Sequence, residues 1–397
     1  MRRPIAVLAT AAASALLAAA PAHAVSQWPQ FRGNSQGTGQ STATGPTRAA
    51  AVRGFPFKAA GTVASPVVSN NGTVVFGGGA YLYAVSPSGR QLWRYYGGQS
   101  TTFGMAPAVT GGGTVYAVSS QAIPGAVFSE TNLIALTPQG QLKWSEEVGF
   151  STSPPTPVNV TLGPDGTIYT TGPDNPDTGG WRLQAFNSAG DQQWSTQFPG
   201  VTSPPVVDPN SGNIYVAGSV TPGSPSGFSG PGSGVAAVQP GGAILWTSQA
   251  GGSFSPTVGP DGTVYAAGEG IASFTSSGML LGNTAFGEEG AAGPTTLTAT
   301  GTILIPTGGG VAQVTSPTGG GTQIDVPGAT QTGSTPVNDA AGNVFFGAGD
   351  VFAAASSSGR ILWTARTTAA LQSPAMAADG TVYVPDGRVL RAYGPGS

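Results

Sequence analysis

One stretch of the sequence, residues 63–93, recurs in altered form along most of the chain, and this repetition limits the possible folds more than any other feature. Each copy opens with a proline step and a short apolar run. A glycine turn follows, then a Thr-Val-Tyr-like run, a Leu-Tyr-Ala-Val-like run and a run that ends in Leu-Trp. A unit of this length cannot bury its apolar residues alone, so neighbouring copies must pack against one another.

The copies have the length and the pattern of four-stranded antiparallel sheets. Apolar and polar residues alternate within short runs, with no stripe of about 3.6-residue period, which predicts strands rather than helices. Successive opening prolines are 38 to 51 residues apart, as in the blades of β-propellers. These prolines are Pro66, Pro107, Pro155, Pro205, Pro256, Pro294, Pro336 and Pro374. The repeats therefore predict an all-β, eight-bladed β-propeller of four-stranded antiparallel blades.

The two ends of the repeated region complement each other. The eighth copy stops after its third strand, at residues 389–393, while an unpaired strand-like segment at residues 52–60 precedes the first copy. If this N-terminal strand completes the last blade, the ring closes and no sheet edge is left open to aggregation. Seven blades remain the alternative, should the weak fifth and sixth copies merge.

The first 24 residues have the form of a signal peptide. Arg2 and Arg3 precede an apolar stretch at residues 5–20, and residues 22–24 read A-H-A, an A-x-A cleavage site. The chain has no cysteine, so an acyl group has no attachment site. We therefore expect a protein that is secreted through its signal peptide, periplasmic or extracellular, with no membrane span and no lipid anchor.

The rest of the chain divides into two parts. Residues 25–47 show no repeat and are expected to form an extended N-terminal arm, which Trp28 and Phe31 would anchor to the body. Residues 48–397 are expected to form the propeller. A closed propeller exceeds the usual size of a single domain because it grows by adding blades around an axis.

The processed chain has a narrow chemical inventory. His23 is the only histidine and lies in the predicted signal, so neither histidine nor cysteine remains. This excludes Ser-His-Asp and Cys-His catalysis, His-ligated metals, haem and iron–sulfur clusters, and leaves only all-oxygen metal sites. Lys+Arg falls from 14 to 12 against 17 Asp+Glu, a formal net charge of −5. A chain of this charge is not suited to nucleic acid.

A tryptophan ends most copies at a fixed distance after an alanine and a turn glycine. The residues are Trp93, Trp144, Trp194, Trp246 and Trp363. A flat indole between two blades buries about 150–250 Å² of surface, and the small alanine leaves room for it. We expect these residues to dock the blades together, with Phe57 in the same place in the closing blade. Gly282 and Thr322 replace the tryptophan in blades 5 and 6, which predicts looser packing there.

The Ala-x-x-x-x-Gly-x-x-x-Trp pattern of residues 84–93 resembles the tryptophan-docking repeat of pyrroloquinoline quinone (PQQ) propellers. The arm sequence WPQFRG, residues 28–33, resembles the N-terminal segment of PQQ-like repeat proteins. The resemblance covers nearly all of residues 26–393 and implies the eight-bladed fold of the quinoprotein alcohol dehydrogenase-like superfamily. That fold hosts dehydrogenases, outer-membrane assembly scaffolds and many proteins of unknown role, so the resemblance does not fix an activity.

The features of a PQQ-dependent dehydrogenase are not matched by this sequence. In that family, Glu and Asn hold a Ca²⁺ ion, an Asp is catalytic, and a vicinal cysteine pair is common. No cysteine exists here, and none of the glutamates lies in a matching context. Asp208 lies where other copies have an Asp-Gly turn, which favours an Asx turn over a Ca²⁺ loop. We therefore expect no catalytic residue, no metal and no cofactor; a minimal PQQ- and Ca²⁺-dependent oxidoreductase is the alternative.

Three insertions mark where binding could be hosted, because loops on a rigid scaffold commonly carry function. They are residues 119–131, 172–181 and 219–234, in blades 2 to 4. The second contains Asp174, Asp177, Trp181 and Arg182. An aromatic beside carboxylates could bind sugar or peptide, but Trp181 could equally pack on its own blade. The sequence thus predicts a monomeric, non-catalytic module with a protein or polysaccharide partner at the propeller rim; a structural surface or spacer domain is a further alternative.

Overall fold

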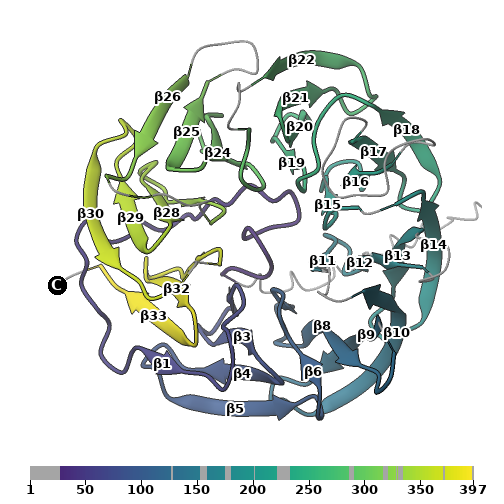
Figure 1. Ribbon diagram of the computed structural model, residues 1–397, viewed down its shortest axis with the longest axis horizontal. Coiled ribbons are helices and arrows are strands. Elements are labelled where there is room, and N and C mark those ends of the chain that lie inside the picture. Colours follow the sequence, from purple (N-terminus) through teal and green to yellow (C-terminus); the bar gives the residue numbers. More distant parts are fainter. Residues whose placement is uncertain are drawn as a thin grey trace, which may run out of the picture.

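A computed structural model gives the structure of the chain. It describes residues 27–126, 128–152, 159–174, 180–200, 202–220, 233–285, 290–315, 321–327, 329, 334–369 and 372–395. In these residues 33 strands form eight antiparallel sheets around one axis, without a helix (Figure 1). No helix in this part of the chain is therefore long and apolar enough to cross a membrane. The predicted eight-bladed, all-β propeller is confirmed.

The blades share one plan, in which four strands run in order from the axis to the perimeter; blade 2 has one further short strand. Blades 1 and 2 contain β2 (Val67–Val68), β3 (Val74–Gly78), β4 (Tyr81–Val85) and β5 (Gln91–Tyr96), then β6 (Thr101–Thr102), β7 (Ala108–Val109), β8 (Val115–Ala122), β9 (Phe128–Leu136) and β10 (Leu142–Thr152). Blades 3 and 4 contain β11 (Val160–Leu162), β12 (Ile168–Pro173), β13 (Trp181–Phe186) and β14 (Gln192–Phe198), then β15 (Val206–Val207), β16 (Ile214–Gly218), β17 (Gly234–Val238) and β18 (Ile244–Ser248). Blades 5 and 6 contain β19 (Thr257–Val258), β20 (Val264–Ala267), β21 (Gly270–Phe274) and β22 (Leu280–Ala285), then β23 (Thr296–Leu297), β24 (Ile303–Pro306), β25 (Gly310–Val314) and β26 (Gly321–Asp325). Blades 7 and 8 contain β27 (Val337–Asn338), β28 (Val344–Ala348), β29 (Val351–Ala355) and β30 (Ile361–Arg366), then β31 (Ala375–Met376), β32 (Val382–Asp386), β33 (Val389–Tyr393) and β1 (Phe57–Lys58).

Blade 8 combines the two ends of the repeated region. β1 pairs with β33 in an antiparallel register that places Phe57 opposite Leu390 and Lys58 opposite Val389. The last blade therefore takes three strands from the C-terminal end and its outermost strand from the N-terminal end. This split agrees with the eight-bladed prediction and removes the seven-bladed alternative.

The hydrophobic core is divided among the junctions between blades. One cluster joins Leu82 of blade 1 to Ile134 of blade 2, and another joins Tyr215 of blade 4 to Phe274 of blade 5. The second and third strands of the blades are nearly continuously buried because both faces of each sheet pack against a neighbour. Each blade is therefore stable only within the ring.

Four of the five tryptophans dock onto the turn between the third and fourth strands of the next blade, and Trp363 docks onto the N-terminal arm. The indole N–H of Trp194 donates to the Pro240 carbonyl at 2.7 Å, and the ring lies against Gly242, whose φ is +91°. A Cβ at Gly242 would lie 2.8 Å from the ring, so glycine is required by both the backbone and the contact. The other indole N–H groups, of Trp93, Trp144, Trp246 and Trp363, donate to the carbonyls of Pro138, Ser188, Ser276 and Pro46.

In the closing blade and in blade 6, residues other than tryptophan make the contact with the next blade. Phe57 does not lie opposite the alanine of its blade, because a turn at residues 52–55 shifts it to the position opposite Leu390. It still bridges two blades, since its ring packs edge-on against Tyr83 of blade 1 with centroids 5.5 Å apart. In blade 6, Thr322 lies opposite Gln313, and the buried Ile324 approaches the turn glycine of blade 7 instead.

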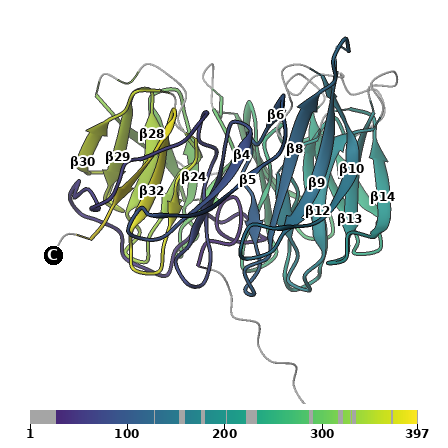
Figure 2. The same ribbon diagram turned by 90° about the horizontal axis from the view of Figure 1, so that it is seen from below.

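The N-terminal arm runs once around the inside of the ring. Gln27 first accepts a hydrogen bond from Ala378 of blade 8. The arm then accepts one from the inner strand of each following blade, with acceptors Trp28, Pro29, Gln30, Ser35, Gln36, Thr38 and Gly39 and donors Val68, Val109, Leu162, Val207, Val258, Leu297 and Asn338. The donors precede the first hairpin turn of their blades, so the arm lies across the axis at that end of the ring (Figure 2).

The docking contact predicts the effect of removing one indole. Trp194→Ala should lower the free energy of unfolding by about 3 kcal/mol, because a large side chain between two sheets and its hydrogen bond are both lost. Urea unfolding followed by circular dichroism measures the change. The neighbouring Gln193→Ala, at an exposed position of the same strand, is the matched control. A loss of less than about 0.5 kcal/mol for Trp194→Ala would show that the indole does not hold the junction.

Candidate functional site

Arg32 belongs to the arm that lies across one end of the axis. Its guanidinium is buried and donates to five acceptors of blades 5 and 6. The shortest bonds are from Nη2 to Ser255 Oγ at 2.6 Å and to the Pro256 carbonyl at 2.8 Å. All five acceptors are hydroxyl or carbonyl oxygens, and burial without a carboxylate lowers the pKa of Arg32 to about 9. The arginine thus ties the arm to blades 5 and 6.

The oxygens at this end of the axis do not fit a Ca²⁺-bound quinone. Calcium requires six to eight oxygen ligands, usually including carboxylates. In the parts of the chain that the structure describes, no three Asp or Glu side chains gather into such a group. The hydroxyl and carbonyl oxygens of blades 5 and 6 already bind the Arg32 cation, which would repel a second cation. The expectation that no cofactor binds stays a prediction.

The candidate calcium loop at Asp208 is an Asx turn. One carboxylate oxygen accepts the backbone N–H of Asn210 at 3.0 Å, and the other accepts the Ser211 hydroxyl at 2.6 Å. Asp208 is 3% exposed, so its oxygens serve the turn itself. The turn interpretation of the sequence agrees with this geometry.

Replacing Arg32 tests its role as an anchor. Arg32→Ala should destabilise the protein by about 3 kcal/mol, because several buried oxygens of blades 5 and 6 lose their donor. Thermal unfolding and limited proteolysis of the arm measure the effect. Arg53→Ala, at an exposed position after the arm, should change little. Equal stability of the two variants would contradict the anchoring role.

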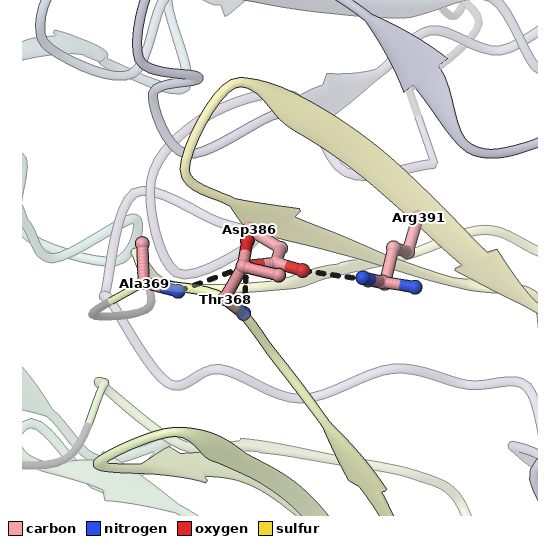
Figure 3. A network of polar contacts seen from close by, with 4 residues as sticks. All are labelled: Thr368, Ala369, Asp386 and Arg391. Atoms are coloured by element: carbon pink, nitrogen blue, oxygen red, sulfur yellow. Dashed lines mark hydrogen bonds and ion pairs between the residues drawn. The ribbon is translucent and has the colours of Figure 1, made fainter.

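A second buried charge holds the junction between blades 7 and 8 (Figure 3). Asp386 is fully buried at the end of β32. Its Oδ1 accepts from the backbone N–H of Thr368 at 2.7 Å, from the Thr368 hydroxyl and from the Ala369 N–H, and its Oδ2 lies 2.7 Å from Arg391 Nε. Burial alone would raise the pKa of Asp386, but the bonds from Thr368 and Arg391 outweigh it and hold the pKa below its usual value. The network fixes the connection that leads from blade 7 into the closing blade.

The lowered pKa of Asp386 predicts a pH dependence. The fold favours the charged carboxylate, so its stabilisation is complete above the unfolded pKa of about 4 and is lost as the pH falls through the folded value. Asp386→Asn should therefore cost about 2 kcal/mol at neutral pH and progressively less in acid. Melting temperatures between neutral and acid pH measure this difference. Asp350→Asn, which alters an exposed ion pair with Arg366, is the control; a pH-independent cost at Asp386 would contradict the assignment.

Only some of the residues that the sequence predicts for ligand binding at the rim are accessible to a ligand. Asp174 forms an ion pair with Arg182 at 2.9 Å, and the Gln197 amide donates to the second carboxylate oxygen at 2.7 Å. Trp181 is 4% exposed and lies opposite Phe198 in the sheet, so it packs on its own blade. Of the two interpretations that the sequence left open for Trp181, packing on its own blade agrees with this burial, and binding at the rim does not. Asp177 lies outside the described residues.

The sequence analysis missed an aromatic pair on the neighbouring blade. Phe128 of β9 and Phe150 of β10 meet edge to face with ring centroids 5.5 Å apart, and both are partly buried. A register shift between Glu147 and Gly149 places Phe150 opposite Glu130. Phe128 lies within the predicted insertion at residues 119–131, but Phe150 lies outside all three predicted insertions. The pairing therefore becomes visible only with the register of β9 and β10.

The pair belongs to an extension of the blade 2 sheet. β8, β9 and β10 contain 8, 9 and 11 residues, against at most seven in the strands of the other blades. β6 pairs with the far end of β8, where Thr101 lies opposite Gln121. This end is opposite the arm, because the arm bonds to Val109 beside the beginning of β8 (Figure 2). The predicted insertion in blade 2 is thus largely extended sheet.

The extension contacts blade 3 beside its Asp174–Arg182 ion pair. A Cβ at Gly149 would lie 2.0 Å from the Pro173 carbonyl and 3.9 Å from Arg182 Nη2, so β10 and the end of β12 approach closely. Gln184 of blade 3 also donates to the Val148 carbonyl at 2.8 Å. The aromatic pair and the Asp174–Arg182 ion pair therefore share one sector of the rim. We call Phe128, Phe150, Asp174, Arg182 and Gln197 the rim cluster.

Comparison with known proteins supports the fold. No protein-family model and no curated protein matches the sequence. The structure is similar to the crystal structure of BamB from Moraxella catarrhalis, with a TM-score of 0.56 and 16% sequence identity over 86% of this chain and 95% of that chain. A protein of unknown function from Bacteroides caccae matches with a TM-score of 0.35 and 12% identity over 56% of this chain and 80% of its own. The likeness to BamB concerns the propeller fold.

Proposed function

We propose that the protein is a secreted, non-catalytic scaffold that binds a protein partner through the rim cluster of blades 2 and 3. The observation that carries the proposal is the hydrogen-bonded extension of blade 2, which holds two partly exposed aromatic rings beside an ion pair of blade 3. Aromatic and arginine side chains on rigid elements are the typical energetic centres of protein interfaces, because they lose little conformational freedom on binding.

The geometry favours a protein over a polysaccharide at this place. The two rings of the rim cluster meet at 84°, so they form a corner rather than one flat platform for a sugar ring. Trp181, the flat aromatic in this sector, is buried. Arg182 is a quarter exposed and already paired with Asp174, which suits a carboxylate or carbonyl at the edge of a protein interface.

The axis supports a scaffold rather than a minimal quinoprotein. The arm lies across one end of the axis, and its Arg32 occupies oxygens that an enzyme would need for a cation. The spacer alternative requires contact between copies of the chain, which the experiment below separates from binding of another protein.

The rim cluster is tested by crosslinking in the secreting cell. A photoreactive amino acid at the exposed Gln121 should crosslink a second protein, and Arg182→Glu or Phe150→Ala should lower the yield about tenfold or more. Arg366→Glu, which breaks the exposed ion pair of blade 7, is the matched control and should leave the yield unchanged.

Two outcomes would contradict the proposed function. Equal yields from all variants would show that the rim cluster does not hold the partner. Crosslinks formed only between copies of the chain would favour the spacer domain. Melting temperatures of the variants, measured first, ensure that the blades are intact.

A further inference from the structure

Charge is divided unevenly around the ring. Residues 97–333, which span the strands of blades 2 to 6, contain 13 acidic residues and two basic ones, Lys143 and Arg182. Residues 48–96 and 334–397, which span the strands of blades 7, 8 and 1, contain four acidic and nine basic residues. The nine are Arg48, Arg53, Lys58, Arg90, Arg94, Arg360, Arg366, Arg388 and Arg391. An acidic chain thus carries one sector of net positive charge.

The four acidic residues of this sector leave part of it uncompensated. Asp339 and Asp386 are 2% and 0% exposed, and Asp386 forms an ion pair with Arg391. Asp350 forms its ion pair within blade 7. Asp379 lies in the first hairpin turn of blade 8, at the end of the ring where the arm lies. At the opposite end, blades 8 and 1 therefore expose basic side chains without exposed acidic ones.

The outer strand of blade 1 has an open face beside the closing strand. β1 contains two residues, whereas the outermost strands of the other blades contain five to eleven. In β5, Arg94 lies opposite Tyr83 of β4, and Tyr96 lies opposite Tyr81. The four side chains therefore share one face, which is turned toward blade 8 because Tyr83 belongs to the apolar cluster there. Arg94 is exposed and Tyr96 is 52% exposed, so blade 8 does not cover this face.

Tyr81 lies in the middle of a line of aromatic rings on this face. Its ring centroid is 5.1 Å from that of Tyr96 and 5.9 Å from that of Tyr83, and Tyr83 meets Phe57 of β1 at 5.5 Å. The guanidinium carbon of Arg94 is 5.2 Å from the centroid of Tyr81. A guanidinium that stacks on a ring keeps its N–H groups in its own plane, where they can bind both oxygens of a carboxylate. Among the described residues, no carboxylate lies within ion-pair distance of Arg94.

Arg388 approaches the same line of rings from blade 8. Its guanidinium donates to the Ala60 carbonyl, and the Ala60 N–H donates to the Tyr83 hydroxyl at 3.0 Å. Arg388 is exposed, and a carbonyl does not neutralise its charge. Tyr83 therefore connects the two arginines across the junction of blades 8 and 1. We call Tyr81, Arg94, Tyr96 and Arg388 the basic cluster.

The surroundings of the basic cluster limit its ligand. Two arginines attract an anion, but a long polyanion would extend onto the acidic blades 2 to 6 and be repelled there. A symmetric dimer through the cluster would bring the arginines of the two copies together, with like charges facing each other. A short acidic segment of another protein meets neither obstacle. Tyrosine beside arginine is also typical of the residues that hold protein interfaces together.

We propose that the basic cluster at the junction of blades 8 and 1 binds a short acidic segment of a partner protein. Carboxylates of the segment pair with Arg94 and Arg388, and its apolar groups pack on Tyr81 and Tyr96. The acidic blades 2 to 6 repel the same segment, which directs it to this junction. The site is separate from the rim cluster, so either can fail without the other.

A pair of peptides tests the class of ligand. The probe is a short fluorescent peptide of glutamates and serines around one phenylalanine, and its reference peptide has glutamine in place of every glutamate. Anisotropy at low salt should show saturable binding of the probe to the full processed protein. The binding should weaken about tenfold or more in Arg94→Glu and in Arg388→Glu. Arg90→Glu makes the same change of charge before the arm end of β5, so it is the matched control and should weaken binding less than about twofold.

The other possible results would overturn the proposal. No saturation at about 1 mM probe, equal weakening in Arg90→Glu and Arg94→Glu, or equal binding of the glutamine peptide would show that the basic cluster does not recognise carboxylates. Binding of polygalacturonate that depends on Arg94, without binding of the probe, would assign the site to an acidic polysaccharide. A dimer in sedimentation velocity that Arg94→Glu converts to a monomer would assign it to a second copy. The substituted arginines are exposed, so unchanged melting temperatures are expected and show that the blades are folded.

Discussion

Closure of the ring by residues 27–58 is the constraint on which the rest of the structure depends. The arm supplies acceptors to the inner strands, and the same segment then supplies β1 to the perimeter of blade 8. An extended arm loses about 1–2 kcal/mol of conformational freedom per residue, which single hydrogen bonds of about 1 kcal/mol do not offset. Buried anchors must make up the difference, and Trp28 and Arg32, 1% and 3% exposed, are placed to do so. The arm is stable only against a complete ring, and the ring is closed only with the segment that follows the arm.

The repeated features of the structure could be predicted from the sequence, and the features that occur once could not. The repeated opening prolines, turns and strands leave similar signals along the chain, so the number of blades, the split blade and the contacts of five tryptophans could be inferred before the structure. The path of the arm could not, because each of its partners is a single backbone group in a different repeat. Phe57 was placed in the wrong register for a related reason. The turn at residues 52–55 shifts it relative to Leu390, and nothing in the repeat pattern encodes that shift.

The candidate site was predicted only in outline. Insertions identified blade 2 and blade 3, yet strand direction decides which side chains face solvent, and Trp181 alternates into the junction. The rim aromatics come from an extension of β9 and β10 whose register shift the composition does not reveal. Asp174 and Arg182 lie in the same predicted insertion, so their proximity could be expected, and the structure shows an ion pair between them.

Comparison between blades separates residues that serve the ring from residues that do not. A tryptophan that recurs in five of the eight blades has a structural cause, whereas Leu245 and Leu280 are each 48% exposed and Leu362, at the place of Leu245 in blade 7, is partly buried. The difference arises because residues 46–58 occupy the side of the ring at blades 7 and 8. Blades 2 to 5 lie on the other side (Figure 1). The chain has therefore used the perimeter at blades 7 and 8 for its own closure, and the outer strands of the other blades are not covered in this way.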